Sequence, residues 1–406
     1  MYKNKFYFFI EFIIGFILLL ISLFILFHPS MMIFSMRILG IIILFNGLYM
    51  VWKQRNNKTG IILSLFVGII LSLFPALPFT LFVFLFAFYI CIKGLSQFIT
   101  YYLYKQNHIS YRFIILLSSL FLINFGFTYL LSPYIHLYQT NIIICIYLIY
   151  LALSFILKGI REIMGENRQN QIKRRIHVSL PVILNALIPR IMIDYINEKL
   201  ETPSFIHTDG HNIDLTVFIH VSKNGFGAVG HVDISYQNIV YAYGAYDDLS
   251  NHLLGAIGDG VLFEVDESSY IDFCLKDDPQ SVIFAYTLQL NHQQTQLIEN
   301  NLQSLKQQLL PFELTHHQDT YAKRLQEYTH AQFYKFKKGR FQKYFVLTTN
   351  CVLLADSIIG TSGIDIIGIN GMISPGSYYT YFEEEARKEY SRVYQKKIYA
   401  SSSYHL

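Results

Sequence analysis

Two residues of this chain, Cys351 and His231, have the chemical types and the local settings that thiol catalysis requires. Cys351 follows Thr348-Thr349-Asn350, a cluster of residues that favour helix N-caps, so a helix is predicted to begin at or beside the cysteine. The positive end of a helix stabilises a thiolate, and a nearby imidazolium strengthens this effect. A cysteine in such a position can attack a carbonyl carbon while a histidine carries the proton.

His231 lies in the segment 230–244, in which two β-prone runs flank Gln237-Asn238. This pattern predicts a β-hairpin with His231 at the start of its first strand. Catalysis also needs a polar group that orients the imidazole, and oxyanion donors, which the amides at the helix start could supply. Asp247 is the candidate orienting residue because it follows the partner strand, although a two-residue turn would direct it to the wrong face.

The strand and the helix that position these residues belong to a polar region with further β-prone and helical stretches. Strands are predicted at 213–221, 261–265 and 282–290, and a helix with one apolar stripe is predicted at 293–310. The sequence therefore predicts an α+β domain over residues 205–380 and a charged helical tail over residues 381–406.

Gly230-His231-Val232 and Asn350-Cys351 resemble the motifs of the permuted papain-like superfamily, which includes NlpC-type hydrolases and the lecithin:retinol acyltransferase group. In that superfamily a histidine on an early strand precedes the nucleophilic cysteine, which begins a later helix. The resemblance covers roughly residues 205–375. It implies a papain-like fold in which Cys351 is the nucleophile, His231 is the general base and acid, and Asn350 is the motif neighbour of the cysteine.

No metal, cofactor or nucleic acid is expected as a partner. His207, His211 and His220 have suitable ligand types but no recognised zinc spacing, and a phosphate-binding glycine loop is missing. The net charge of +4 is small and is spread over short basic loops. The four cysteines form no disulfide framework, which indicates a reducing compartment for the polar domain.

The first 160 residues have a composition typical of a membrane domain. The chain is 53% hydrophobic, and the excess is concentrated in this part. Since a bilayer crossing needs roughly 20 apolar helical residues, six transmembrane helices are predicted. They lie at 6–27, 31–52, 60–76, 79–99, 113–132 and 140–158.

The basic residues predict the orientation of these helices, because short positively charged loops stay in the cytoplasm. Lys and Arg precede the first helix and follow the second, fourth and sixth, whereas the turns at 28–30, 75–78 and 132–140 contain neither. The N-terminus and the polar domain are therefore expected on the cytoplasmic side of the cell membrane. Residues 161–204 are predicted to form a basic linker and an amphipathic helix that lies on the bilayer rather than crossing it.

The six helices also show an internal repeat. Each of three predicted hairpins turns at a proline, in Phe27-His28-Pro29, Ala76-Leu77-Pro78 and Leu131-Ser132-Pro133. With these turns and this helical layout, residues 1–160 resemble the HdeD-like family of small six-helix membrane proteins, which are linked in some bacteria to acid resistance. The resemblance implies an α-helical membrane bundle.

These features favour an integral membrane protein with a cytoplasmic thiol-dependent hydrolase or acyltransferase domain, acting on an amide or ester near the membrane. The alternative is a non-catalytic, stress-associated membrane protein with a binding or scaffolding domain, in which Cys351 is a buried apolar residue and His231 a structural histidine. A transporter is a third hypothesis, disfavoured by the scarcity of polar groups at mid-membrane. The substrate and the oligomeric state are left open by the sequence.

Overall fold

The computed structural model describes residues 2–28, 30–53, 58–131, 137–163, 214–221, 230–253, 255–314, 319–360, 375–386 and 391–400. The chain divides into two compact units. The helical unit comprises residues 2–99 and 113–164, and the sheet unit comprises chiefly residues 165–406, together with 100–112. The predicted basic linker and amphipathic helix of residues 161–204 lie outside the described residues, apart from the end of a helix that reaches Ile163.

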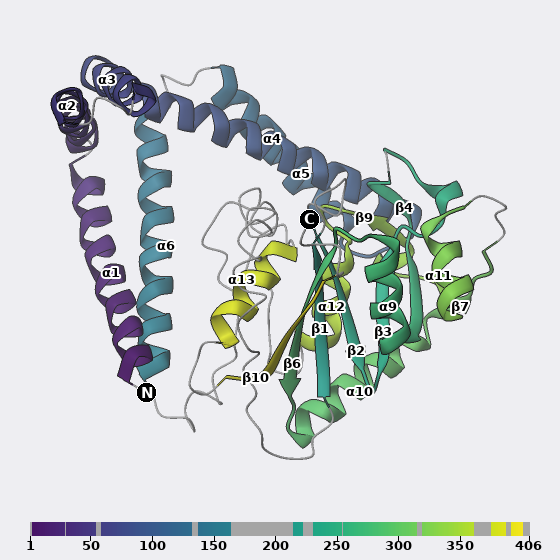
Figure 1. Cartoon of the computed structure of the whole chain (residues 1–406). Coiled ribbons are helices and arrows are strands. Elements are labelled where there is room, and N and C mark those ends of the chain that lie inside the picture. The colour runs from purple at the N-terminus through teal and green to yellow at the C-terminus, as the bar shows by residue number, and fades with distance from the viewer. Residues whose placement is uncertain are drawn as a thin grey trace. The chain divides into compact units, whose positions relative to one another are not determined.

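Six helices fill the described part of the N-terminal half (Figure 1). They are α1 (Tyr2–Phe27), α2 (Ser30–Lys53), α3 (Lys58–Leu73), α4 (Leu77–Gln106), α5 (Arg112–Leu131) and α6 (Leu137–Ile163). Among the described residues, four stretches are long and apolar enough to cross a membrane: Phe9–Phe27, Ile33–Lys53, Leu77–Gln106 and Arg112–Leu131. The helices Lys58–Leu73 and Ile144–Leu157 are apolar but shorter. The N-terminal half is therefore a helical region with several membrane-capable helices.

The close helix pairs differ from the three predicted hairpins. Those hairpins joined α1 with α2, α3 with α4, and α5 with α6, whereas the observed pairs are α1 with α6, α2 with α3, and α4 with α5. Glycines make these approaches possible: a Cβ atom on Gly68 of α3 would lie 2.6 Å from the backbone nitrogen of Leu44 in α2. A Cβ on Gly126 of α5 would lie 3.0 Å from the carbonyl oxygen of Ala87 in α4. Small residues thus set the pairing, as is usual for helices in lipid.

The sheet unit is built on an antiparallel sheet of eight strands (Figure 1). The spatial order is β10-β6-β1-β2-β3-β5-β8-β7, and a second sheet pairs β4 with β9. The strands are β1 (Asp214–Val221), β2 (His231–Tyr236), β3 (Ile239–Gly244), β4 (Ile257–Asp259), β5 (Val261–Asp266), β6 (Val282–Gln289), β7 (Leu309–Pro311), β8 (Gln332–Phe336), β9 (Lys343–Phe345) and β10 (Val393–Ala400).

Helices cover both faces of the eight-stranded sheet. Those with described residues are α9 (Glu267–Asp277), α10 (His292–Lys306), α11 (Tyr321–Thr329), α12 (Cys351–Ile359) and α13 (Pro375–Ala386). One buried cluster joins α10, α12 and α13 to alternate side chains of the central strands, such as Val232 and Ile234. A second cluster joins α9 and α11 to the opposite face, where Phe218 and Ala242 lie. The alternation gives each face its own apolar core.

Several predicted elements are confirmed. The hairpin of β2 and β3 turns at Gln237 and Asn238, whose φ angles of 53° and 62° are those of a tight type I′ turn. His231 is the first residue of β2, as predicted, and the predicted strands 213–221, 261–265 and 282–290 correspond to β1, β5 and β6.

The charged tail differs from the prediction. Residues 381–406 were expected to form a charged helical tail, but α13 ends at Ala386 and Val393–Ala400 forms β10, which pairs antiparallel with β6. The many Lys and Glu residues suggested a helix. The segment instead contains the β-prone Val393 and Ile398 and pairs with β6, which lies more than a hundred residues earlier in the sequence.

Candidate active site

The thiol of Cys351 is held at the N-terminus of α12, as the sequence predicts. Asn350 is the N-cap residue: its side-chain oxygen accepts a hydrogen bond of 3.0 Å from the backbone nitrogen of Leu353, and its Nδ2 donates to the Val346 carbonyl. Thr349 anchors the preceding turn through a 2.9 Å hydrogen bond from Oγ1 to the Lys343 carbonyl. The residues chosen as N-cap candidates therefore fix where the helix starts, and with it the position of Cys351.

His231 is positioned by the pairing of β2 with β1. In the register of β1 and β2, His231 lies opposite His220. Gly230, directly before it, has a φ of 89°, and a Cβ atom there would lie 2.9 Å from Pro375 Cβ and 3.1 Å from the His220 carbonyl oxygen. Only glycine fits this approach to the strand without strain.

The structure brings Cys351 and His231 together. The thiol and the imidazole lie close enough to interact, and this interaction helps to raise the pKa of His231. Cys351 is 4% exposed, whereas the side chain of His231 is 26% exposed. The imidazole is therefore more accessible to solvent than the thiol.

A buried carboxylate lies on the far side of the imidazole, and it belongs to Asp233. Its Oδ1 lies 2.8 Å from His231 Nε2, and its Oδ2 lies 3.0 Å from His220 Nε2. Tyr270 Oη donates a 2.7 Å hydrogen bond to the same Oδ2. Asp233 and His231 are two residues apart on β2, so their side chains share one face of the strand. The site thus joins a thiol, an imidazole and a carboxylate, and His220 and Tyr270 also contact the carboxylate.

These contacts shift the titration of both charged groups. Burial alone would lower the pKa of His231, but the Asp233 carboxylate and the Cys351 thiol beside it outweigh burial and raise the pKa well above its usual value. Burial alone would likewise raise the pKa of Asp233, whereas His231 and His220 hold it well below its usual value. The stable form of the pair is therefore an imidazolium beside a carboxylate.

Asp247, the orienting residue suggested by the sequence, lies in a different ion pair. Its Oδ2 lies 2.6 Å from Lys335 Nζ, which is also 2.8 Å from Asp259 Oδ2. Asp259 contacts Lys343 at the start of β9 as well. Asp247 therefore ties the segment after β3 to β8, and the carboxylate beside His231 is that of Asp233. The signal for Asp233 was present in the sequence, since a residue two positions along a strand from His231 must share its face.

The remaining cysteines have different surroundings from Cys351. Cys274 lies in α9, where burial and the nearby Asp233 charge raise the pKa of its thiol to about 12. Cys91 and Cys145 belong to the helical unit. Within the described residues, no group of three or more His, Cys, Asp or Glu side chains could hold a metal ion, and His207 and His211 lie outside those residues.

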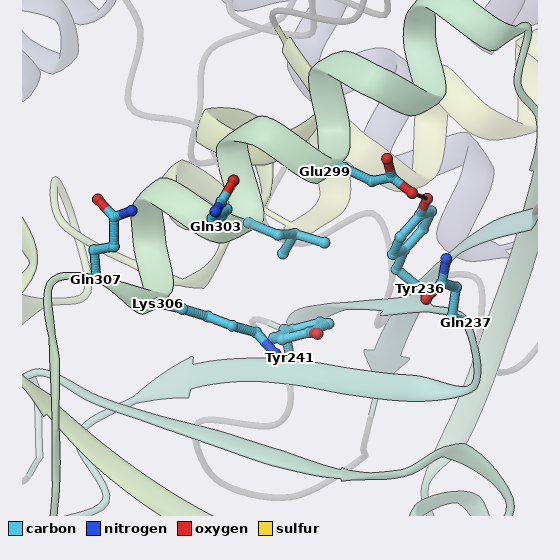
Figure 2. Close-up of a pocket in the computed structure, with 8 residues that line it drawn as sticks. Tyr236, Gln237, Tyr241, Glu299, Gln303, Lys306 and Gln307 are labelled. Carbon is cyan, nitrogen blue, oxygen red and sulfur yellow. Dashed lines mark hydrogen bonds between the residues drawn. The ribbon is translucent and has the colours of Figure 1, made fainter.

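A groove of the sheet unit is a separate feature. It has a volume of about 510 Å³ and lies between α10 and the β2–β3 hairpin (Figure 2). Its charged groups are engaged with its own tyrosines: Tyr236 Oη donates to Glu299 Oε1 at 3.0 Å, and Lys306 Nζ lies 5.1 Å from the centre of the Tyr241 ring. Cys351 and His231 do not line it. Its size alone does not make it the site of chemistry.

Comparison with known proteins bears on the helical unit. The family described as a short repeat of unknown function (DUF308) matches residues 59–131, which include α3, α4 and α5. This match agrees with the resemblance of the N-terminal half to HdeD-like membrane proteins and with a repeated helical unit. No curated protein and no solved structure matches the chain. The chain is thus a membrane protein with a DUF308 region, followed by a sheet-rich domain.

Proposed function

We propose that the sheet unit is a thiol-dependent hydrolase or acyltransferase domain of the permuted papain-like type, which cleaves or transfers an amide or ester group. One observation carries the proposal: the Cys351 thiol at a helix N-terminus contacts His231, whose Nε2 lies 2.8 Å from the buried Asp233 carboxylate. A nucleophile, a base and an orienting acid in this order are the parts that acyl transfer by a thiol requires.

The proposed reaction has two half-steps. The proton of the Cys351 thiol resides on His231 before the attack, so a thiolate bonds to the carbonyl carbon, and the imidazolium gives that proton to the leaving group as its bond to carbon breaks. Water or an acceptor then attacks the thioester, and His231 again carries the proton. Asp233 holds Nε2 throughout, which leaves Nδ1 to exchange the proton with sulfur and substrate.

Oxyanion donors are available at the start of α12. Asn350 accepts hydrogen bonds from the third and fourth backbone amides of α12. Its side-chain oxygen accepts from Leu353 N, and its carbonyl oxygen accepts from Leu354 N. The backbone amides of Cys351 and Val352 precede them and point out of the helix end. These two amides, aided by the helix dipole, are the groups we assign to the charge that develops on the carbonyl oxygen.

Thiol labelling tests the proposal directly. In the full chain in detergent micelles, iodoacetamide should modify Cys351 at least tenfold faster than Cys274, followed peptide by peptide with mass spectrometry. The His231→Gln variant should slow Cys351 labelling by about tenfold or more, because the base and its charge are lost. Cys274, buried with a pKa of about 12, is the reference thiol in the same sample.

The matched control is His252→Gln, which alters an exposed histidine elsewhere in the domain. It should leave the Cys351 rate unchanged. If Cys351 reacts no faster than Cys274, or if His231→Gln has no more effect than His252→Gln, the proposal fails. The alternative of a non-catalytic binding domain then becomes the better interpretation.

We also infer that the six helices all cross the membrane and that the sheet unit faces the cytoplasm. The positions of the six helices and of the basic residues, such as Lys53 at the end of α2 and Lys105 at the end of α4, support this orientation. A membrane-impermeant maleimide added to intact cells should leave Cys351 unmodified, whereas permeant iodoacetamide should modify it. Modification by both reagents at equal rates would place the domain outside.

A further inference from the structure

A second groove of the sheet unit lies on the sheet face that α9 and α11 partly cover. It has a volume of about 390 Å³ and lies beside the β2–β3 turn, the start of α9 and the strand β10; we call it the hydroxyl groove. Ser235, which lines it, is four residues from His231 along β2, a distance of about 13 Å. Cys351 and His231 do not line this groove, so it is separate from the proposed acyl chemistry.

The floor of the hydroxyl groove is a row of polar side chains across four neighbouring strands. Thr216 in β1 pairs in register with Thr287 in β6 and with Ser235 in β2. Gln395 in β10 pairs with Thr287. Since residues paired across strands point to the same face, these four side chains are neighbours. Elsewhere this face carries apolar side chains such as Phe218, so the polar row is a local departure from the core pattern.

The hydroxyl groups of the floor keep hydrogen-bonding capacity for a ligand. Thr216 Oγ1 donates a 3.2 Å hydrogen bond to Thr287 Oγ1, and Ser235 Oγ donates to the Glu267 carboxylate. Among the described residues Thr287 Oγ1 only accepts, so its own proton is available to an acceptor in the groove. The three hydroxyl side chains are at most 8% exposed, and buried polar groups are costly unless they are paired.

The walls of the groove add amides, one charge of each sign and an aromatic ring. The β2–β3 turn contributes the side-chain amides of Gln237 and Asn238, and β10 contributes the ring of Tyr399. Among the described residues that line the groove, the charged ones are Lys397 and Glu267, so the lining has no net charge.

This composition matches a neutral sugar. A sugar hydroxyl both donates and accepts hydrogen bonds, as the hydroxyl and amide groups of the groove do. The C–H groups of the sugar ring can pack against the Tyr399 ring, which is a large and rigid surface. A volume of 390 Å³ lies within the range of about 300–1,000 Å³ that is usual for small-molecule sites. An anion would lie beside Glu267 and a cation beside Lys397, and both arrangements are unfavourable.

We propose that the hydroxyl groove binds a neutral sugar of about the size of a hexose. The floor hydroxyls and the turn amides pair with the hydroxyls of the sugar, and Tyr399 packs against its ring. The sheet unit then has a ligand site that is distinct from the site of Cys351 and His231. This inference does not rest on the proposed function, and each of the two can fail without the other.

Saturation-transfer NMR tests the proposal on the full chain in micelles of lauryldimethylamine oxide, a detergent without a sugar headgroup. The neutral probes are glucose, galactose, mannose and N-acetylglucosamine. The charged probes are glucose 6-phosphate and, at pH 6, glucosamine. At least one neutral sugar should bind with a dissociation constant on the order of 1 mM. It should bind roughly tenfold or more tightly than either charged probe, because the charged group meets a like charge in the groove.

Variants of the floor locate the binding site. Thr287→Val keeps the shape of the side chain and removes its hydroxyl, so it should weaken binding of the best neutral sugar by about tenfold or more. Gln395→Leu, on β10, should weaken it as well and serves if Thr287→Val does not fold. The matched control is Thr329→Val in α11, because the Thr329 hydroxyl donates to the Leu325 carbonyl and does not line the groove. It should keep the wild-type affinity.

The proposal is overturned if none of the neutral sugars binds, or if a charged probe binds more tightly than all of them. It is also overturned if Thr287→Val and Gln395→Leu bind the sugar as well as Thr329→Val does, because the sugar then lies outside the hydroxyl groove. Cys351→Ala should bind the sugar like the wild-type chain, since the two sites share no residue.

Discussion

Replacing Asp233 with Asn is expected to slow formation of the acyl-enzyme at Cys351 by a factor on the order of 10⁴, the size of the loss when the orienting acid of a catalytic triad is made neutral. The amide fills the same space but offers no charge to the imidazole. Its NH₂ group can also turn toward Nε2 and favour the wrong tautomer of His231. The burst of p-nitrophenol from p-nitrophenyl acetate measures the rate.

Asp233→Asn should also change how the free energy of unfolding depends on pH. The pKa of His231 is raised in the folded protein. Its contribution to folding stability is therefore complete below about pH 6.5 and is lost as the pH rises through the pKa of the folded state. Asp233 has a lowered pKa, so its contribution is present above about pH 4 and is lost as pH falls through the folded pKa. Asp233→Asn should therefore be most destabilising between these limits, by about 3 kcal/mol. Heat-induced alkylation of buried Cys274 reports unfolding of the domain.

Asp247→Asn is the matched control, because Asp247 is also a buried carboxylate in an ion pair. It should lower the free energy of unfolding through loss of the Lys335 contact, yet leave the burst rate within about twofold of wild type. Equal loss of activity in both variants would mean that Asp233 acts through general stability. An unchanged burst in Asp233→Asn would remove it from the site.

The local parts of the site were predictable from the sequence because their signals are local. The Thr-Thr-Asn cluster before Cys351 caps α12, and Gln237-Asn238 turns the hairpin that begins at His231. The orienting acid was harder to predict. Asp247 was chosen from its place after β3, but the ion pair with Lys335, a residue 88 positions further along, holds it elsewhere. Such pairings depend on the tertiary fold.

Pairings between distant segments account for the other differences. β10 joins the sheet by pairing with β6, and the sequence of the tail alone shows only its charge. Hydropathy located the helices of the N-terminal half with ends at most seven residues from those observed, but it did not predict how the helices pair. Hydropathy measures transfer into lipid, whereas the pairing depends on where Gly15, Gly68 and Gly126 allow two backbones to meet.

Gly230→Ala is expected to disable the site through the backbone, without changing any group that reacts. A side chain at φ 89° costs on the order of 1–2 kcal/mol, and the clash of its Cβ with Pro375 and with the His220 carbonyl adds about 1–3 kcal/mol. The strand can relieve the clash only by moving its first residue, which is His231. We therefore expect Cys351 labelling by iodoacetamide to fall by about tenfold or more, along with a lower melting temperature.

Gly255→Ala separates the cost of the backbone conformation from the cost of the steric clash. Gly255 has nearly the same φ, 85°, but no described atom lies within 4 Å of the position of its Cβ. It should share the backbone cost of about 1–2 kcal/mol and leave the rate of Cys351 labelling unchanged. If Gly230→Ala loses only as much stability as Gly255→Ala and keeps its labelling rate, the approach of Pro375 and His220 does not position the imidazole. If labelling falls in Gly230→Ala alone, the packing around this glycine sets the distance between His231 and Cys351.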